Sequence, residues 1–487
     1  IPLDDPETFR TIRTTNTLGI FQIESPGQRE LTGKHQPTVF NDLTIQISLF
    51  RPGPMKGNMI APYLDSRHGF AKPKYPHPHL EPILRETFGV VIFHEHVIRI
   101  FNQMTKCGLA KGDEFRRSME NPRVKPQIEK FFREESAKNG YSEAVIQEVW
   151  STVEGFSSFG FCKAHGAAFA MPTYQSAWLK THYPTEFLAG IFTHDPGMYP
   201  RRLLLAEARR LGVKVLPIDV NHSTDEYLVE APHAKSSTNS PGVRMALTEV
   251  QAISDAEVAR IIAEQPFASV ADFYVRAKPS RRTLERLALV GALDSLAGTD
   301  SHTRGDIVAR VRELNAIVKR PQVDPNQPTL NFDVVERMPT GHDQMTNEER
   351  VANKLSILKM DVTEHVLDKY REMLDEMGVV RADELIDLRS KTEVLVAGVR
   401  VATQTPPMRS GKRVVFITLD DGSGCSDSTF FDDAQQRCSS ILFNTRLMVI
   451  AGKTRRTGVR GVSLMAENAW DLRELWTEWA KRPELSA

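Results

Sequence analysis

Apolar residues recur with a helical period through most of the first 195 residues of the chain. The spacing is helix-like over residues 144–153 and 167–188, and Asp5-Pro6-Glu7 is a helix-start signal with Asp5 as the expected cap. Proline-rich stretches at residues 51–54 and 76–79 interrupt this pattern and should form ordered loops or turns. The pattern therefore predicts a mainly helical block.

Smaller units follow this block. Residues 201–211 predict a basic amphipathic helix that ends at Gly212, and residues 213–218 have the composition of a strand. Short helices are expected within residues 242–296. Residues 319–347 are rich in Pro, Asn, Gln, Asp and Thr with little periodicity, which is typical of a linker or a long exposed loop.

The C-terminal part predicts a helix through Tyr370 and Leu374 and then a run of strands. About five short strands within roughly 80 residues favour a small closed barrel of the oligonucleotide-binding (OB) type. The expected fold class is multi-domain: a mainly α domain, a small α(+β) region and a C-terminal β-barrel. The strand-like runs cover residues 394–401, 413–419, 428–431 and 446–450.

Composition excludes several classes of protein. The chain of 487 residues is 40% apolar and 25% charged, with no apolar run near the roughly 20 residues that span a bilayer and no signal-peptide layout. Membrane and secretory classes are therefore excluded. Four scattered cysteines without a Cys-x-x-Cys pair argue against a zinc ribbon or a disulfide scaffold and favour a reducing compartment.

Charge limits the partners. The 62 Lys plus Arg residues balance 62 Asp plus Glu residues, so the formal charge is zero and any polyanion must be held by local clusters. One such cluster is Arg116-Arg117, which offers adjacent guanidinium groups to a triphosphate or a nucleic-acid backbone. A solvated helix face is the simpler interpretation of the same residues. A second cluster has Lys163 and His165 among small residues, which fits either a ligand site or tight helix packing.

Metal binding is not predicted. His94-Glu95-His96 lacks the spacing that places two ligands on one helix face. The acidic pairs Asp4-Asp5, Asp420-Asp421 and Asp432-Asp433 are expected in a helix cap, a hairpin turn and a loop, where local hydrogen bonding explains them.

The linker contains a possible docking peptide at residues 327–332. Gln327, Leu330 and Phe332 can insert a polar head and two apolar anchors into a groove on a partner. Matches of six residues also arise by chance, so the pattern alone leaves both interpretations open.

Several ordered stretches resemble the bacterial C-family DNA polymerases, the alpha subunits of DNA polymerase III. The sequence of three stretches is similar to the error-prone, ImuC-type branch of this family. They are Phe161-Cys162-Lys163-Ala164-His165, residues 193–200 and residues 361–367. The stretches that carry the family resemblance are residues 18–25, 50–54, 89–97, 115–119, 159–170 and 174–180.

The resemblance implies a role for each block. Residues 1–195 would be the polymerase fingers, with the incoming deoxynucleoside triphosphate (dNTP) facing Arg116, Arg117, Lys163 and His165. Residues 196–318 would be a connecting unit with a helix-hairpin-helix region. Here Ala252 and Ser254 replace expected glycines, which puts the phosphate contact of that hairpin in doubt.

Residues 319–347 would then be the linker with its sliding-clamp peptide at Gln327, Leu330 and Phe332, and residues 348–390 a helical segment. Residues 391–487 would be the OB barrel and tail, which meet single-stranded template. The DNA contacts implied for the barrel are Arg409, Lys412, Arg413, Lys453, Arg455 and Arg456.

The resemblance also implies functions outside this sequence. The Mg²⁺ ions of the intact polymerase would be held by palm aspartates that are absent here, so no catalytic residue is assigned in this chain. Because the chain begins at Ile1 without an initiator Met, we expect a fragment that binds primer-template DNA and dNTP but does not extend a primer alone.

Implied partners are the sliding clamp and accessory translesion proteins of the ImuA and ImuB type, in the bacterial cytoplasm. A non-catalytic, clamp-recruited DNA-binding scaffold is the alternative function.

Overall fold

The computed structural model divides into two compact units. The first is Ile1–His182; the second runs from Tyr183 to Arg456 and resumes at Val462. Within the described ranges, no helix combines the length and the apolar character needed to cross a membrane. The structure describes residues 1–50, 59–157, 161–195, 201–231, 241–297, 302–317, 337–360, 365–405, 413–456 and 461–482.

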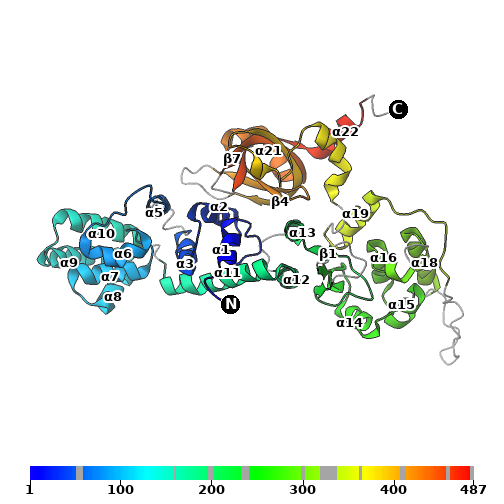
Figure 1. Cartoon of the computed structure of the whole chain (residues 1–487), viewed down its shortest axis with the longest axis horizontal. Coiled ribbons are helices and arrows are strands. Elements are labelled where there is room, and N and C mark those ends of the chain that lie inside the picture. The colour runs from blue at the N-terminus through cyan, green and yellow to red at the C-terminus, as the bar shows by residue number, and fades with distance from the viewer. Residues whose placement is uncertain are drawn as a thin grey trace. The chain divides into compact units, whose positions relative to one another are not determined.

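The first unit is built from helices, which confirms the prediction of a mainly helical block (Figure 1). Asp5 caps the first helix as expected, because its Oδ2 accepts the backbone N–H of Thr8 at 2.9 Å. The helices are α1 (Pro6–Arg13), α2 (Pro26–His35), α3 (Phe40–Leu49), α5 (Ile60–Arg67), α6 (Glu81–Leu84), α7 (His94–Thr105), α8 (Leu109–Ser118), α9 (Lys125–Lys138), α10 (Glu143–Ser157) and α11 (Lys163–His182).

Two apolar cores stabilise this unit. In one, helices α7, α9 and α10 enclose Phe101, Phe132 and Trp150, whose side chains are fully buried. In the other, the long helix α11 runs along α3 and α1 and buries Phe9 and Tyr174 (Figure 1). Each buried aromatic contributes roughly 2–3 kcal/mol of transfer free energy, so both cores hold α11 and its neighbours in fixed positions.

A buried polar network joins α2, α3 and α5. The Nδ1 atom of His35 lies 3.1 Å from Gln46 Oε1, and its Nε2 lies 3.0 Å from the hydroxyl of Tyr63. Because the Gln46 oxygen can only accept, Nδ1 donates to it. Burial, followed by the nearby Arg67 guanidinium, lowers the pKa of His35 to about 4. The ring is therefore neutral at pH 7, and its Nε2 accepts from the Tyr63 hydroxyl.

The second unit begins with two helices and a small sheet, and residues 201–218 form the predicted helix followed by a strand. Strand β3 is central: β1 pairs with it in parallel and β2 in antiparallel orientation. These elements are α12 (Pro184–His194), α13 (Arg201–Arg210), β1 (Lys214–Leu216), β2 (Leu228–Glu230) and β3 (Gly242–Arg244).

Short helices follow the sheet, as predicted for residues 242–296. Ser254, Ser269 and Ser280 cap three of them, since each hydroxyl accepts a backbone N–H three residues ahead. The helices are α14 (Asp255–Glu264), α15 (Val270–Ala277), α16 (Arg281–Val290), α17 (Asp294–Ala297), α18 (Arg304–Ile317) and α19 (Asn347–Ile357).

The C-terminal strands close into a five-stranded barrel with the order β4-β5-β6-β8-β7, and β7 pairs with β4 to close it. The third and fifth strands pair in parallel and a helix joins the third to the fourth, which is the topology of an OB-fold. The predicted barrel is therefore confirmed. Its elements are β4 (Glu393–Gln404), β5 (Val415–Asp420), β6 (Cys425–Phe430), α21 (Asp432–Asn444), β7 (Leu447–Arg456) and β8 (Val462–Asp471), flanked by α20 (Arg371–Glu376) and α22 (Leu472–Trp479).

Two details of the barrel differ from the sequence prediction. Strands β4, with 12 residues, and β7, with 10, are longer than the predicted runs, and β8, also with 10 residues, lies outside all of these runs. Asp432 and Asp433 lie in the first turn of α21 rather than in a loop. Carboxylates are favoured there because they face the positive end of the helix dipole.

We predict that His35 makes the first unit sensitive to acid. The unfolded chain takes up a proton near pH 6.5, whereas folded His35 does so only near pH 4. Stability is therefore complete above about pH 6.5 and falls as the pH drops toward 4, by up to about 3 kcal/mol from this group. Peptide-resolved hydrogen exchange at about pH 7 and about pH 5 measures the unfolding free energy of α2 and α3.

In His35→Gln that loss of stability should largely disappear, whereas replacement of the exposed His79, which lies outside this network, by Gln should leave it in place. An unchanged acid dependence in His35→Gln would assign the effect to other groups.

Candidate nucleotide and DNA interfaces

The start of α11 is fixed by α7 and the segment before it. Phe161 forms a parallel bridge with Phe93, and the N–H of His94 donates to the Phe161 carbonyl at 2.9 Å. The backbone N–H of Lys163 donates to both oxygens of Glu95, at 3.0 and 3.1 Å. A carboxylate from another helix therefore caps α11, where the dipole favours negative charge.

The Lys163 ammonium group lies in a charged cluster. Its Nζ donates to Glu86 Oε2 at 2.6 Å and lies 5.5 Å from the centre of the Phe93 ring. The other oxygen of Glu86 is 3.4 Å from Nε2 of the buried His96. Hydrogen bonds from His96 and then Lys163 lower the pKa of Glu86 to about 2, so its carboxylate is charged and balances Lys163.

His165 belongs to an aromatic column on α11. It is exposed, with ring centroids 5.0 Å from Phe161 and 4.4 Å from Phe169. Phe169 in turn stacks on Phe21, which is 41% exposed. Accessible ring faces of this kind can stack on a base or a sugar. Phe21 and Phe169 were missed by sequence reasoning, although the spacing of four residues between 161, 165 and 169 was a usable signal.

The small residues near the start of α11 were compatible with either a ligand site or tight helix packing, and the structure gives them different surroundings. Gly166 serves packing, because a Cβ there would lie 2.7 Å from Ser48 Oγ on α3. Ala164 and Ala168 are exposed beside His165, so they leave that face of the helix open to a ligand.

Arg116 and Arg117 lie on α8 and share one carboxylate. Asp113 is 3.0 Å from Arg116 Nε and 2.6 Å from Arg117 Nη2, and these contacts lower its pKa against the effect of its own burial. Arg116 is mostly buried, whereas the Arg117 side chain is 72% exposed. Among the described residues, no hydrogen bond, ion pair or ring contact joins these arginines to Lys163 or His165.

The first hairpin of the helix-hairpin-helix region keeps the backbone shape that glycine would favour. Ala252 has φ of +59°, and the N–H of Ile253 donates to the Val250 carbonyl at 3.1 Å. Ser254 caps α14 in a reciprocal pair with Glu257. The replaced glycines therefore do not remove the turn, although Ala252 holds a conformation that costs roughly 1–2 kcal/mol for a residue with a Cβ.

A second hairpin joins α15 to α16 and contacts the first. Lys278 there also has positive φ, +45°, and the N–H of Ser280 donates to Glu257 at 2.7 Å. Lys278 and Arg282 are exposed, and no carboxylate among the described residues pairs with either side chain. These cations were not assigned from the sequence. A usable signal was the basic run 278–282, which lies just before and at the start of a capped helix.

Two connections of the barrel lie in or next to the sequence that carries the predicted DNA contacts. Residues 405–414 join β4 to β5 and residues 457–461 join β7 to β8, and these are the loops with which OB-folds hold oligonucleotides. Arg413 is exposed beside the first connection, whereas Arg409 and Lys412 lie outside the described residues.

The three cations at the end of β7 have different surroundings. Lys453 lies between Glu393 and Glu467, at 3.3 and 3.0 Å. Arg455 is exposed, with no ion pair or hydrogen bond from its guanidinium to the described residues. Arg456 donates to the carbonyls of Ile386 and Leu388 at 2.6 and 3.0 Å, which fixes the segment before β4.

Two further sequence predictions cannot be placed. Gln327, Leu330 and Phe332 of the clamp peptide lie outside the described residues, as does the Arg51–Pro54 motif.

Mg²⁺ in a two-metal site needs clustered carboxylates. In the part of the chain that the structure describes, no group of three or more His, Cys, Asp or Glu side chains is arranged to hold a metal ion. The described residues do not fit such a site.

The fold combines a helical unit, a region of short capped helices and a closed barrel with OB topology, and comparisons with known families match two of these parts. Residues 1–140 match the bacterial DNA polymerase III alpha subunit finger domain, and residues 212–303 match a helix-hairpin-helix motif. These matches agree with the resemblance that the sequence motifs indicated: residues 1–140 are similar to the finger domain of the bacterial DNA polymerase III alpha subunits.

Individual relatives extend the similarity beyond these modules. The chain is 34% identical over 478 residues to the error-prone DNA polymerase of Symbiobacterium thermophilum, which aligns with 91% of this chain and 44% of the relative. It is 32% identical to the error-prone DNA polymerase of Bdellovibrio bacteriovorus, over 94% of this chain and 44% of the relative. The DNA polymerase III subunit alpha of Xylella fastidiosa is 29% identical over 99% of this chain and 42% of the relative. The chain thus spans less than half the length of these relatives.

Proposed function

We propose that the chain is the fingers, helix-hairpin-helix and OB-barrel portion of an error-prone DNA polymerase that acts in translesion synthesis. The observation that carries the proposal is the order of its modules. A finger domain, a helix-hairpin-helix region and a closed barrel with OB topology follow one another in a chain similar to error-prone polymerases over nine-tenths of its length. The scaffold alternative has no comparable support.

The fingers bind the incoming dNTP through Lys163 and His165, with Arg116 and Arg117 as further phosphate contacts. The geometry of the first pair supports this assignment, because an ammonium group and an open aromatic column lie within one turn of α11. A triphosphate would compete with Glu86 for Lys163 and with Asp113 for the arginines. The carboxylates therefore weaken binding while they hold the cations in place.

Removing the charge of Glu86 should strengthen dNTP binding. Glu86→Gln frees Lys163 from a partly exposed ion pair, worth at most about 1 kcal/mol, so a two- to fivefold lower Kd is expected. Lys163→Gln should raise the Kd by about tenfold, since a hydrogen bond to a charged phosphate is lost. Calorimetric titration of the chain with dNTP measures both.

Glu114→Gln, which breaks the exposed pair with Lys111 on α8, is the matched control and should not change the Kd. Unchanged affinity in both Glu86→Gln and Lys163→Gln would exclude this end of α11 from the nucleotide site.

Primer-template DNA contacts the two hairpins and the barrel. Lys278 and Arg282 support a backbone contact at the second hairpin, and Arg455 supports one at the barrel, because these exposed cations can take phosphate without breaking an ion pair to the described residues. Lys453 and Arg456 have less support as DNA contacts. Lys453 already lies between two carboxylates, and Arg456 already donates to backbone carbonyl groups. Arg409, Lys412 and Arg413 complete the proposed set.

Replacement of Arg455 should flatten the salt dependence of DNA binding. Arg455→Ala removes one phosphate contact, so the slope of log K against log salt should fall by about 0.7 to 0.9. Fluorescence anisotropy of labelled primer-template at several salt concentrations measures the slope. Arg473→Ala, an exposed arginine on α22, is the control and should keep the wild-type slope. A wild-type slope in Arg455→Ala would reject the contact.

The linker peptide recruits a sliding clamp, with accessory proteins of the ImuA and ImuB type as further partners in the bacterial cytoplasm. The support is the sequence pattern and its position in the resemblance. Leu330→Ala combined with Phe332→Ala should abolish capture of the clamp in a pull-down, because both apolar anchors are lost. Val335→Ala is the control in the same linker, and undiminished capture by the double variant would reject the peptide.

A further inference from the structure

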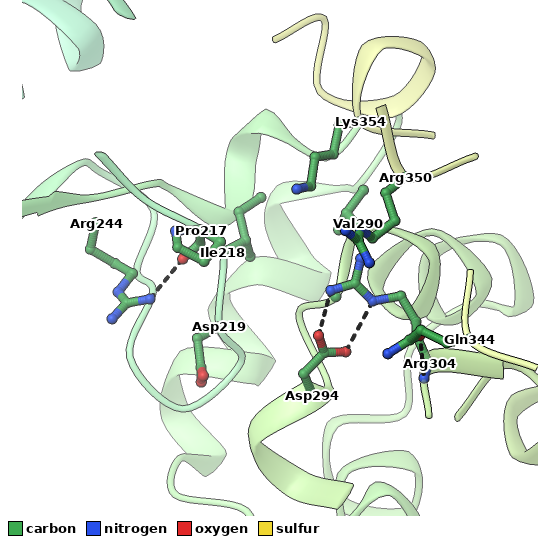
Figure 2. A pocket seen from close by; sticks show the side chains of 11 residues that line it. Pro217, Ile218, Asp219, Arg244, Val290, Asp294, Arg304, Gln344, Arg350 and Lys354 are labelled. Carbon is green, nitrogen blue, oxygen red and sulfur yellow. Dashed lines mark hydrogen bonds and ion pairs between the residues drawn. The ribbon is translucent and has the colours of Figure 1, made fainter. Parts of the chain in front are cut away.

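A cavity of about 380 Å³ lies within the second unit. It is lined by the loop after β1, the ends of β3 and α16, the start of α17 and of α18, the segment before α19, and helix α19 (Figure 2). Its lining residues are Pro217, Ile218, Asp219, Arg244, Val290, Gly291, Asp294, Arg304, Gln344, Arg350 and Lys354.

The charge of the lining favours an anion. Four of these residues are cations and two, Asp219 and Asp294, are carboxylates. All three side-chain nitrogens of Arg244 already donate, two of them to Glu230 and one to the Pro217 carbonyl. The other three positive charges of the lining belong to Arg304 on α18 and to Arg350 and Lys354 on α19.

Arg304 is held with one nitrogen unused. Asp294 accepts from its Nε at 3.3 Å and from its Nη2 (Figure 2). The Nη1 atom is buried and has no hydrogen-bond partner among the described residues. A buried donor without an acceptor costs about 1–3 kcal/mol, and a phosphate oxygen within hydrogen-bond distance of Nη1 would remove that cost.

Lys354 adds a second donor from α19. It is only 4% exposed, although lysine is rarely buried to this extent. Figure 2 shows Lys354 and Arg350 entering the cavity on the side opposite Asp219. Guanidinium and ammonium groups that converge from two helices match the several oxygens of a phosphate group better than a single carboxylate.

We propose that this cavity is a binding site for a phosphate group, with Arg304 and Lys354 as its main donors. Its volume suits a small phosphate or diphosphate compound. A phosphodiester of bound DNA offers the same chemistry. The site is separate from the dNTP contacts on α11, and its existence does not depend on the proposed polymerase function.

Titration of the full chain with inorganic pyrophosphate tests the proposal, in a Lys163→Gln background that weakens the α11 site. Arg304→Gln and Lys354→Gln should each raise the Kd at least tenfold. Asp294→Asn should lower it several-fold, because a negative charge leaves the lining. Arg312→Gln, an exposed arginine on the same helix as Arg304, should have no effect. A binding site requires opposite changes in Kd for Arg304→Gln and Asp294→Asn. If the two residues formed a purely structural ion pair, both variants would change only the melting temperature.

A second arm distinguishes the two sources of phosphate. If Arg304→Gln weakens pyrophosphate binding and leaves duplex binding intact, the ligand is a small molecule. If it lowers the salt slope of duplex binding by about one, the ligand is a DNA phosphodiester. No saturable pyrophosphate binding together with an unchanged duplex slope, or equal binding by wild type and Arg304→Gln, would overturn the proposal even where dNTP and primer-template binding are normal.

Discussion

The first unit depends on one buried charge, the ammonium group of Lys180. Its side chain is 1% exposed, and its Nζ donates to the carbonyls of Asn16 and Leu18 at 2.8 and 2.6 Å. A buried ammonium group is tolerated only where acceptors replace its water. These hydrogen bonds therefore attach the C-terminal end of α11 to the N-terminal loop. Because α11 is one helix of 20 residues, they also help to position its N-terminal end, where Lys163 and His165 lie. Two stretches of the family resemblance, residues 18–25 and 174–180, meet at this contact.

The positive and negative charges of the chain, which sum to zero overall, are also balanced locally at several of the proposed contact residues. Lys163 is balanced by Glu86, the two arginines of α8 share Asp113, and Lys453 lies between two glutamates. Paired cations of this kind bind a phosphate only by exchange of one anion for another, so the gain in free energy is small and falls with salt. In the proposed DNA interface, exposed cations outside such pairs, such as Arg455 on the barrel and Arg282 at the second hairpin, would contribute more to affinity. A neutral chain can thus hold a polyanion through a few positions.

Local patterns in the sequence predicted the fold far better than they predicted the site. The helical block, the helix and strand of residues 201–218 and the closed barrel each follow from periodicity within one segment, which short-range spacing reports directly. The pairing of Lys163 with Glu86 spans 77 residues, and no spacing rule connects two such positions. Asp432 was misplaced because an acidic pair suits both a loop and a first helical turn. The doubt over Ala252 arose because residue type alone does not report φ, and tertiary contacts hold that residue at +59°.

The end of β7 shows how strand geometry divides residues that sequence reasoning grouped together. Side chains alternate between the two faces of a strand, so Lys453 and Arg455 share one face while Thr454 and Arg456 share the other. On that second face, the hydroxyl of Thr454 donates to the Arg389 carbonyl at 2.5 Å, and Arg456 binds the carbonyls of Ile386 and Leu388. Both residues therefore fasten the preceding segment to the barrel. Adjacent arginines in a strand consequently have different surroundings: Arg456 stabilises the barrel wall, whereas Arg455 is exposed near the connection between β7 and β8.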